Sequence, residues 1–110
     1  MVLVRRFGGW SPVEAADGVG TLRRHDGEAV EGVRYSFEVW HQFAQGFPGP
    51  YRSEGAVAGL TPADLAALIG QAVLLEMADG RFLASRIAPD ATLLSHGEPS
   101  ASDPWADGAT

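Results

Sequence analysis

Three histidines, His25, His41 and His96, are the side chains of this 110-residue chain best suited to acid–base or metal chemistry near neutral pH. None of them stands at a spacing typical of metal ligands, and the sequence contains no H-E-x-x-H motif. The chain has no cysteine, which excludes disulfides, thiolate nucleophiles and cysteine-bound metals. The residue pattern therefore predicts neither a metal site nor a bound cofactor.

The patterns for a nucleophile and for a phosphate-binding loop are incomplete as well. The best serine context, Tyr51-Arg-Ser53-Glu-Gly55, lacks the first glycine of G-x-S-x-G. No third glycine follows Gly18 and Gly20 at the dinucleotide-loop spacing, and a chain without lysine cannot form a G-x-x-x-x-G-K-[ST] loop. The sequence gives no positive sign of an enzyme and leaves catalysis open.

Aromatic side chains gather around residue 45. Trp40 lies on the polar side of a strand that the sequence predicts over residues 33–43. The glycine- and proline-rich segment 44–54 follows this strand and carries Phe47 and Tyr51. Aromatic residues beside an arginine, here Arg52, are typical of interface hot spots. We therefore expect a non-catalytic protein-binding or assembly module that uses this surface or an exposed strand edge. The expected partner is another protein or a second copy of the chain.

Two other functions stay open. Arg34, Glu38 and His41, with Arg52, could converge at a barrel mouth and form a small-ligand pocket or an active site. Against this, His41 extends an apolar row, and a buried histidine bonded to a carbonyl oxygen explains it more simply. An acidic inhibitor or immunity-type protein that mimics nucleic acid is the third possibility, and it requires the acidic side chains to share one face.

The net charge narrows the range of partners. Eight arginines against fourteen acidic residues give a net charge of −6 and a pI near 4.8. This charge disfavours binding to nucleic acid or to an anionic membrane, where basic residues supply most of the affinity. The sequence also lacks an apolar stretch of the roughly 18 residues that a membrane span needs. The expected location is the cytoplasm.

The element that must position Trp40 and His41 is a strand over residues 33–43. Val33, Tyr35, Phe37, Val39, His41 and Phe43 alternate with more polar residues over this segment. Alternation with a period of two indicates a strand that has one face on a core. Trp40 and Glu38 belong to the other face.

Two Asp-Gly pairs predict hairpins. Asp79-Gly80 separates two apolar runs, and a two-residue type I′ loop there places Met77 opposite Phe82. A weaker copy surrounds Asp26-Gly27, 53 residues earlier in the chain. An internal duplication into two similar halves is one explanation of this spacing. Apolar residues on both faces of the later hairpin favour a closed or strongly curled sheet.

One short helix is expected at 62–69. Thr61 supplies an N-cap hydroxyl, Pro62 suits the first helical position, and Gly70 ends the pattern. Two turns cannot be stable alone, so the helix must lie on the sheet, with the open end of a barrel as its natural place.

We therefore predict an all-β fold, a small antiparallel barrel or tight sandwich of six or seven strands with this one helix. An α+β sheet whose open face is covered in a dimer is the alternative. The domain is expected over residues 1–96, and 97–110 is expected to form an acidic, disordered tail that carries Trp105. The strands are predicted near 2–7, 19–25, 28–43, 55–60, 72–78, 81–88 and 91–95.

Overall fold

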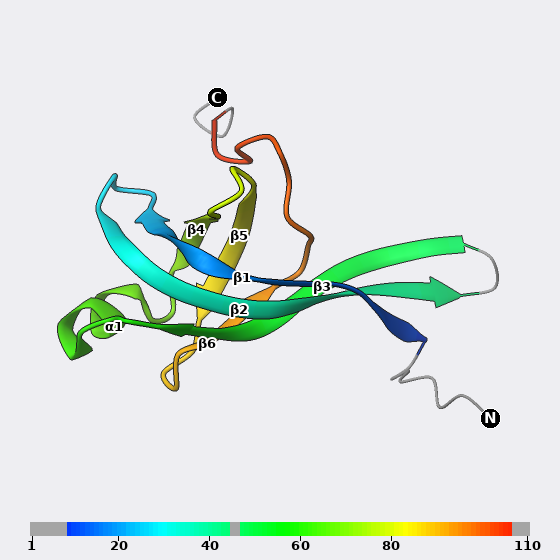
Figure 1. Ribbon diagram of the computed structural model, residues 1–110, viewed down its shortest axis with the longest axis horizontal. Coiled ribbons are helices and arrows are strands. Elements are labelled where there is room, and N and C mark those ends of the chain that lie inside the picture. Colours follow the sequence, from blue (N-terminus) through cyan, green and yellow to red (C-terminus); the bar gives the residue numbers. More distant parts are fainter. Residues whose placement is uncertain (1–8, 45–46, 107–110) are drawn as a thin grey trace.

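The chain folds into a closed antiparallel β-barrel (Figure 1). The computed structural model describes residues 9–44 and 47–106, and this part of the chain holds six strands and one short helix. Around the barrel the order is β1-β2-β3-β6-β5-β4. The elements are β1 (Trp10–Arg24), β2 (Ala29–Ala44), β3 (Phe47–Ala58), α1 (Pro62–Leu68), β4 (Ala72–Glu76), β5 (Phe82–Ile87) and β6 (Thr92–Ser95). The all-β prediction is confirmed, and the open-faced α+β alternative is wrong because the sheet closes on itself.

The barrel consists of two three-stranded meanders with the same topology. β1, β2 and β3 form the first, and β4, β5 and β6 form the second. Antiparallel pairing of β1 with β4 and of β3 with β6 joins them. Leu22 and Leu75, which stand at the 53-residue spacing of the two Asp-Gly pairs, are directly opposite each other in the β1–β4 pair. This arrangement is the one that an internal duplication would give.

Apolar side chains fill the barrel interior. The inward row of β2 is buried as predicted from Val33 to Val39, with Phe37 at 3% exposed. Seven aliphatic residues of this core come from the other elements and are almost completely buried: Leu22, Leu68, Val73, Leu75, Leu83, Ile87 and Leu93. The closed sheet therefore surrounds a packed core, which supplies most of the folding free energy.

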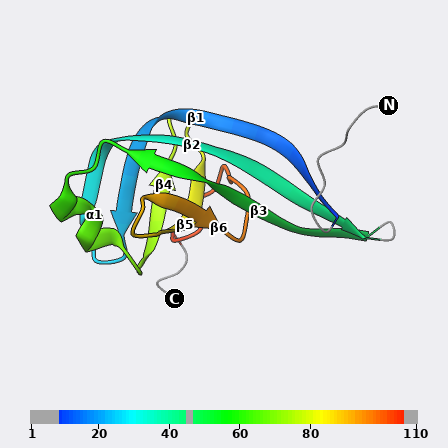
Figure 2. The ribbon, with the colours of Figure 1, turned by 90° about the horizontal axis from the view of Figure 1, so that it is seen from below.

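The helix closes the end of the barrel that lies opposite the extended β2–β3 hairpin (Figure 2). The Thr61 side chain accepts a hydrogen bond from the backbone N–H of Asp64 at 3.1 Å, so the predicted N-cap is confirmed. Leu68 is 1% exposed and belongs to the core. Gly70 follows the helix with φ 77°, a conformation that favours glycine.

The first three strands continue beyond the barrel. The pairing of β1 with β4 covers residues 21–24, and the pairing of β3 with β6 covers residues 53–56. Beyond these pairs β1, β2 and β3 remain hydrogen-bonded to each other and extend away from the barrel (Figure 1). We call this three-stranded extension, residues 10–12, 40–44 and 47–52, the arm.

Several predicted boundaries differ from the structure. The segment 44–54, expected as a loop, is mostly strand β3, and β1 begins at Trp10 rather than near residue 19. Long-range pairing with β2 explains both differences, because it outweighs the weak strand propensity of Pro48, Gly49 and Pro50. The strand predicted near 2–7 lies outside the described residues.

The turn geometry also differs from the prediction. Gly80 donates a hydrogen bond to the Met77 carbonyl at 3.0 Å, and Met77 donates to Arg81 at 2.8 Å, which makes a three-residue loop. Gly80 has a positive φ of 89°, whereas Asp79 does not adopt a positive φ. This pattern is a type I turn followed by a glycine bulge, so Glu76 lies opposite Phe82 and the predicted register is one residue off. The loop at Asp26-Gly27 has the same hydrogen bonds.

The C-terminal segment contacts the barrel over residues 97–106, contrary to the disordered tail that we expected there. Ser100 exchanges two backbone hydrogen bonds with Phe82, at 2.7 and 2.8 Å. Asp103 accepts a hydrogen bond from Arg23 at 2.8 Å, and the Trp105 ring stacks on His25 at 3.6 Å between centroids. The reason is the edge of β5, which pairs with β6 at Arg86 and Ile87 and offers Phe82 to the returning chain. Residues 107–110 lie outside the described part.

Candidate binding groove on the outer face of the arm

The register of β2 with its neighbours decides which side chains share the outer face of the arm. Trp40 lies opposite Arg52 on β3 and opposite Pro12 on β1. Glu38 lies opposite Glu54, one step closer to the barrel. Directly opposite residues of an antiparallel pair point to the same side of the sheet. The arm therefore presents aromatic and charged side chains together on the face that points away from the core.

These side chains line a groove of about 580 Å³ at the base of the arm. We call it the outer groove; its lining residues are Trp10, Glu38, Trp40, Arg52, Glu54, Gly55 and Thr92. Both indoles are partly buried, and Glu38, Arg52 and Glu54 are exposed. A hollow of this size is within the range of binding clefts, about 300–1,000 Å³, and its lining combines apolar surface with a few charged groups.

The charges in the outer groove do not balance. The Arg52 Nη2 atom donates a hydrogen bond to the Glu54 Oε1 atom at 2.8 Å. Among the described side chains, Glu38 makes no ion pair. The described part of the lining thus carries two carboxylates and one guanidinium, all on exposed residues. The exposed Arg52–Glu54 pair contributes little to folding, typically below about 1 kcal/mol.

The opposite face of the arm has a different character. His41 is 7% exposed, and its Nε2 atom lies 3.1 Å from the Gly49 carbonyl oxygen, so the Nε2–H donates this hydrogen bond. The rings of His41 and Tyr51 stack at 4.0 Å, and Phe43 contacts His41 edge-on. Burial, and then the Glu98 carboxylate, raise the pKa of Tyr51 above its usual range. This inner face continues the core, against which Tyr51 packs.

The structure separates the residues that the sequence proposed as one partner surface. Trp40 and Arg52 line the outer groove, whereas Tyr51 stacks on His41 on the inner face. Phe47 pairs through its backbone with Ala44, and its side chain lies outside what the structure describes. Trp10 and Glu54 were not predicted from the sequence as groove residues. Glu54 could have been found, because it stands two residues from Arg52 and shares its face in a strand.

The proposed ligand pocket at the barrel mouth is not formed. Arg34 and Glu38 point outward from β2, while His41 is buried on the inward face. Residues 38 and 41 are separated by an odd number of positions, so a strand places them on opposite faces. The simpler interpretation of His41, a buried ring bonded to a carbonyl oxygen, is confirmed.

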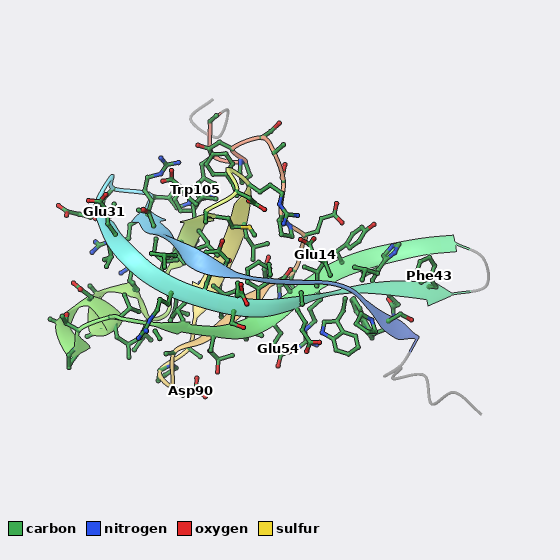
Figure 3. All side chains as sticks on the ribbon, viewed as in Figure 1. Glu14, Glu31, Phe43, Glu54, Asp90 and Trp105 are labelled. Carbon is green, nitrogen blue, oxygen red and sulfur yellow. The ribbon has the colours of Figure 1, made fainter. Side chains whose placement is uncertain are left out.

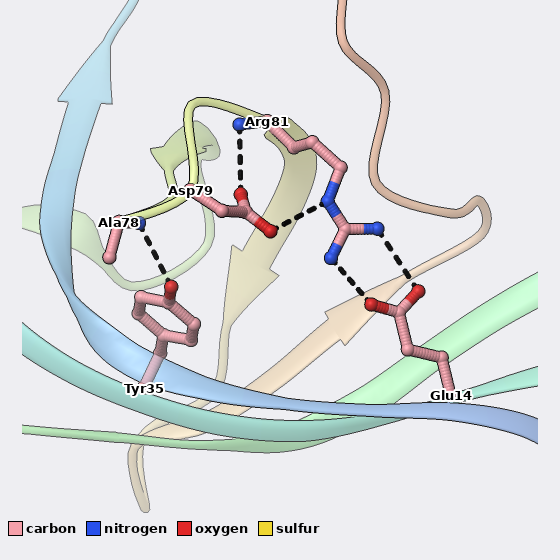
Figure 4. Close-up of polar contacts among 5 residues, drawn as sticks. All are labelled: Glu14, Tyr35, Ala78, Asp79 and Arg81. Carbon is pink, nitrogen blue, oxygen red and sulfur yellow. Dashed lines mark hydrogen bonds and ion pairs between the residues drawn. The ribbon is translucent and has the colours of Figure 1, made fainter.

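A second charged cluster lies where β1 leaves the barrel (Figure 4). The Arg81 guanidinium donates to both Glu14 carboxylate oxygens, at 3.0 Å for the Nη1–Oε1 bond, and its Nε atom donates to Asp79 at 2.9 Å. Hydrogen bonding by Arg81 lowers the pKa of Glu14 and of Asp79 and raises that of Arg81. Nearby, the Tyr35 hydroxyl accepts a hydrogen bond from the Ala78 backbone N–H at 2.9 Å. These side chains connect β1 and β2 to the β4–β5 turn, and their role is structural.

Neither a metal-binding cluster nor a membrane-spanning helix is present in the part of the chain that the structure describes. Within residues 9–44 and 47–106, no group of three histidine or acidic side chains could hold a metal ion. Over the same residues, the structure contains no helix with the length and apolar character that crossing a bilayer requires. In comparisons with known protein families, with curated proteins and with solved structures, no match to this chain was found. The fold and the site define a small closed β-barrel with a three-stranded arm.

Proposed function

We propose that this chain is a non-catalytic module that binds another protein through the outer groove of the arm. The observation that carries the proposal is the arm itself, which extends past the strand lengths that close the barrel and holds Trp10, Trp40 and Arg52 around one groove. Tryptophan and arginine are the residues most enriched among interface hot spots. Side chains on the exposed face of the arm contribute little to the stability of the barrel. A binding role therefore explains why this face carries two tryptophans and an arginine.

The groove is a better candidate than the strand edges. A free edge recognises a partner strand through its backbone N–H and C=O groups, and prolines or bulges obstruct that pairing. β1 has Pro12 and a bulge beside it, and the free part of β3 has Pro48 and Pro50. Both edges of the arm are thus poorly suited to adding a strand, and the face of the sheet is left for recognition.

The alternative functions have less support. A ligand-binding barrel needs an interior space, and apolar side chains fill the interior here. A nucleic-acid mimic needs its carboxylates on one face, whereas Glu14, Glu31, Glu54 and Asp90 lie in separate places on the molecule (Figure 3). Neither arrangement favours the alternative over protein binding.

The experiment compares the two faces of the arm. A Trp40→Ala, Arg52→Ala double variant removes the outer anchors, and Phe43→Ser, at a side chain that is 53% exposed on the inner face, is the matched control. Affinity capture from the source cells with mass spectrometry identifies partners, and titration with the purified partner gives affinities. We expect the double variant to bind at least about thirtyfold more weakly, the effect of losing one hot spot, and the control to bind like the wild type.

Circular dichroism and thermal unfolding must show that each variant is folded. If the double variant does not fold, Trp40→Leu alone removes one indole from the groove and leaves the charges of the groove unchanged. Sedimentation velocity detects any dimer of the chain. If such a dimer is lost in the same variants, the partner is a second copy of the chain. A folded double variant that retains every partner at wild-type affinity would refute the proposal.

A further inference from the structure

We infer that the outer groove recognises a cationic side chain, an arginine or lysine, in a basic segment of the partner protein. This inference rests on the proposed function and specifies the chemistry of the partner. It follows from three properties of the groove: two carboxylates directly opposite each other, a guanidinium already engaged by one of them, and two indoles in the same lining.

The carboxylates are the first property. Glu38 and Glu54 are directly opposite in the β2–β3 pair, and such residues have Cβ atoms about 4.5–5.5 Å apart. Like charges at this separation destabilise a sheet. Arg52 neutralises Glu54 through its 2.8 Å hydrogen bond, and Glu38 makes no ion pair among the described residues. A cation from outside would give Glu38 an ion-pair partner, so the groove has an electrostatic reason to bind one.

The second property is the Arg52 guanidinium, which is already paired and therefore disfavours an anionic partner. Arg52 is the only basic residue among the described residues of the lining, and its Nη2 atom is already bonded to Glu54. An incoming carboxylate or phosphate would have to compete with Glu54 and approach Glu38 as well. The net charge of the whole chain, −6, adds a long-range field that steers basic partners toward the molecule and repels acidic ones.

The indoles are the third property. The face of a tryptophan ring attracts guanidinium and ammonium groups, and the attraction is strongest where the cation is partly desolvated. Trp10 and Trp40 line the same hollow as Glu38. An aromatic surface beside a carboxylate is the combination that binds a cation from two directions. A basic side chain can therefore place its apolar stem against an indole and its charge near Glu38.

The probe that tests this is an acetylated, amidated pentaarginine peptide, compared with pentalysine and with neutral pentaglutamine. NMR titration of the ¹⁵N-labelled chain follows the three indole N–H signals separately. We expect the signals of Trp10 and Trp40 to shift with pentaarginine, while that of Trp105, which stacks on His25 outside the groove, stays in place. Pentaglutamine should bind at least roughly tenfold more weakly, and added salt should weaken the pentaarginine complex.

A charge-matched pair of variants separates the groove from net charge. Glu38→Gln and Glu31→Gln each remove one exposed carboxylate of β2, seven residues apart, which is about 23 Å along a strand. Figure 3 shows Glu31 at the end of β2 far from Phe43 and the arm. We expect Glu38→Gln to weaken pentaarginine binding about two- to fivefold, as for a partly exposed ion pair, and Glu31→Gln to leave it nearly unchanged.

The results distinguish this inference from the proposed function. Equal weakening by both variants, or equal binding of pentaarginine and pentaglutamine, overturns the cation site. If the captured partner binds Glu38→Gln with wild-type affinity but not the Trp40→Ala, Arg52→Ala variant, the cation site is again wrong while the protein-binding role stands. If the captured partner binds even the folded double variant as tightly as the wild type, the protein-binding role is wrong and the inference falls with it.

Discussion

The two halves of the barrel share one topology but differ greatly in length. β1, β2 and β3 have 15, 16 and 12 residues, whereas the corresponding β4, β5 and β6 have 5, 6 and 4. The second half is sufficient to complete its side of a closed barrel. Some of the additional residues of the first half form the arm, and closure of the barrel does not account for these.

Along β2, the burial of the aromatic side chains changes where the strand extends beyond the barrel. Inside the barrel, β2 carries Val33, Tyr35 and Phe37, which are at most 4% exposed. In the arm the same strand carries Trp40 at the outer groove and Phe43, which is 53% exposed. Aromatic residues on a half-exposed sheet contribute less to folding than buried ones and more to recognition. This difference assigns stability to the barrel and supports the proposal that the arm binds a partner.

The largest expected effect compares two phenylalanines on the same face of β2, one in the barrel and one in the arm. Phe37→Ala should lower the free energy of unfolding by about 4 kcal/mol, because Phe37 is 3% exposed and its loss leaves a cavity. Phe43→Ala, six residues further along β2, should cost less than about 1 kcal/mol. Urea unfolding measures both. Similar losses at the two positions would mean that the arm is as important to folding as the barrel.

A smaller effect contrasts two tyrosine hydroxyls. Tyr35→Phe removes the acceptor of the Ala78 N–H hydrogen bond and should cost about 1 kcal/mol. Tyr51→Phe, on the arm, should cost only a few tenths, because the surroundings of Tyr51 are partly exposed. Thermal and urea unfolding of the two variants check this order. A greater loss for Tyr51→Phe would contradict the assignment of stability to the barrel.

Backbone strain offers a test within the shorter half. The loops that end at Gly80 and at Ala91 have the same hydrogen bonds, with φ of 89° and 69°. Gly80→Ala should destabilise by about 1 kcal/mol, since a Cβ there meets nothing within 4 Å and only the positive φ opposes it. Ala91→Gly should stabilise by about 0.5 kcal/mol. Neither change should alter binding at the outer groove; if either does, the two regions are coupled.

The smallest effect depends on pH. The hydrogen bond from Arg81 lowers the pKa of Glu14 below its ordinary value of 4.5, so the pair stabilises the fold above that pH and loses its effect as pH falls through the folded-state pKa. Glu14→Gln should therefore cost at most about 1 kcal/mol at pH 7, and the difference from wild type should shrink below about pH 4. Asp17→Asn, at an exposed carboxylate of the same strand, is the control. A difference that grows on acidification would contradict the assignment.

The sequence predicted the barrel better than the arm, for a physical reason. β2 and α1 have strong local signals, an alternation of apolar residues and a capped two-turn pattern, so both were found. β1 and the start of β3 contain Pro12, Pro48 and Pro50, which locally favour loops. Their strand conformation comes from pairing with β2, a long-range effect that no local pattern shows.

The outer groove was predictable only in part. Trp40 and Arg52 were identified because an aromatic residue on the polar face of a strand stands out from its neighbours. Grouping them with Tyr51 was wrong, since the register places Tyr51 opposite the buried His41. The contribution of Trp10 depends on the pairing of β1 with β2 over a long hairpin. Such a register is fixed by the folded sheet and cannot be derived from the spacing of residues within one segment.

Site-specific photocrosslinking in the source cells tests the binding role of the arm most directly. A benzoylphenylalanine replaces Glu38 in the outer groove in one variant and Glu31, at the far end of the same strand, in the other. We predict a discrete covalent adduct with a partner protein from position 38 after irradiation, and none of that mass from position 31. No adduct from position 38 in a folded protein, or the same adduct from both positions, would contradict the account.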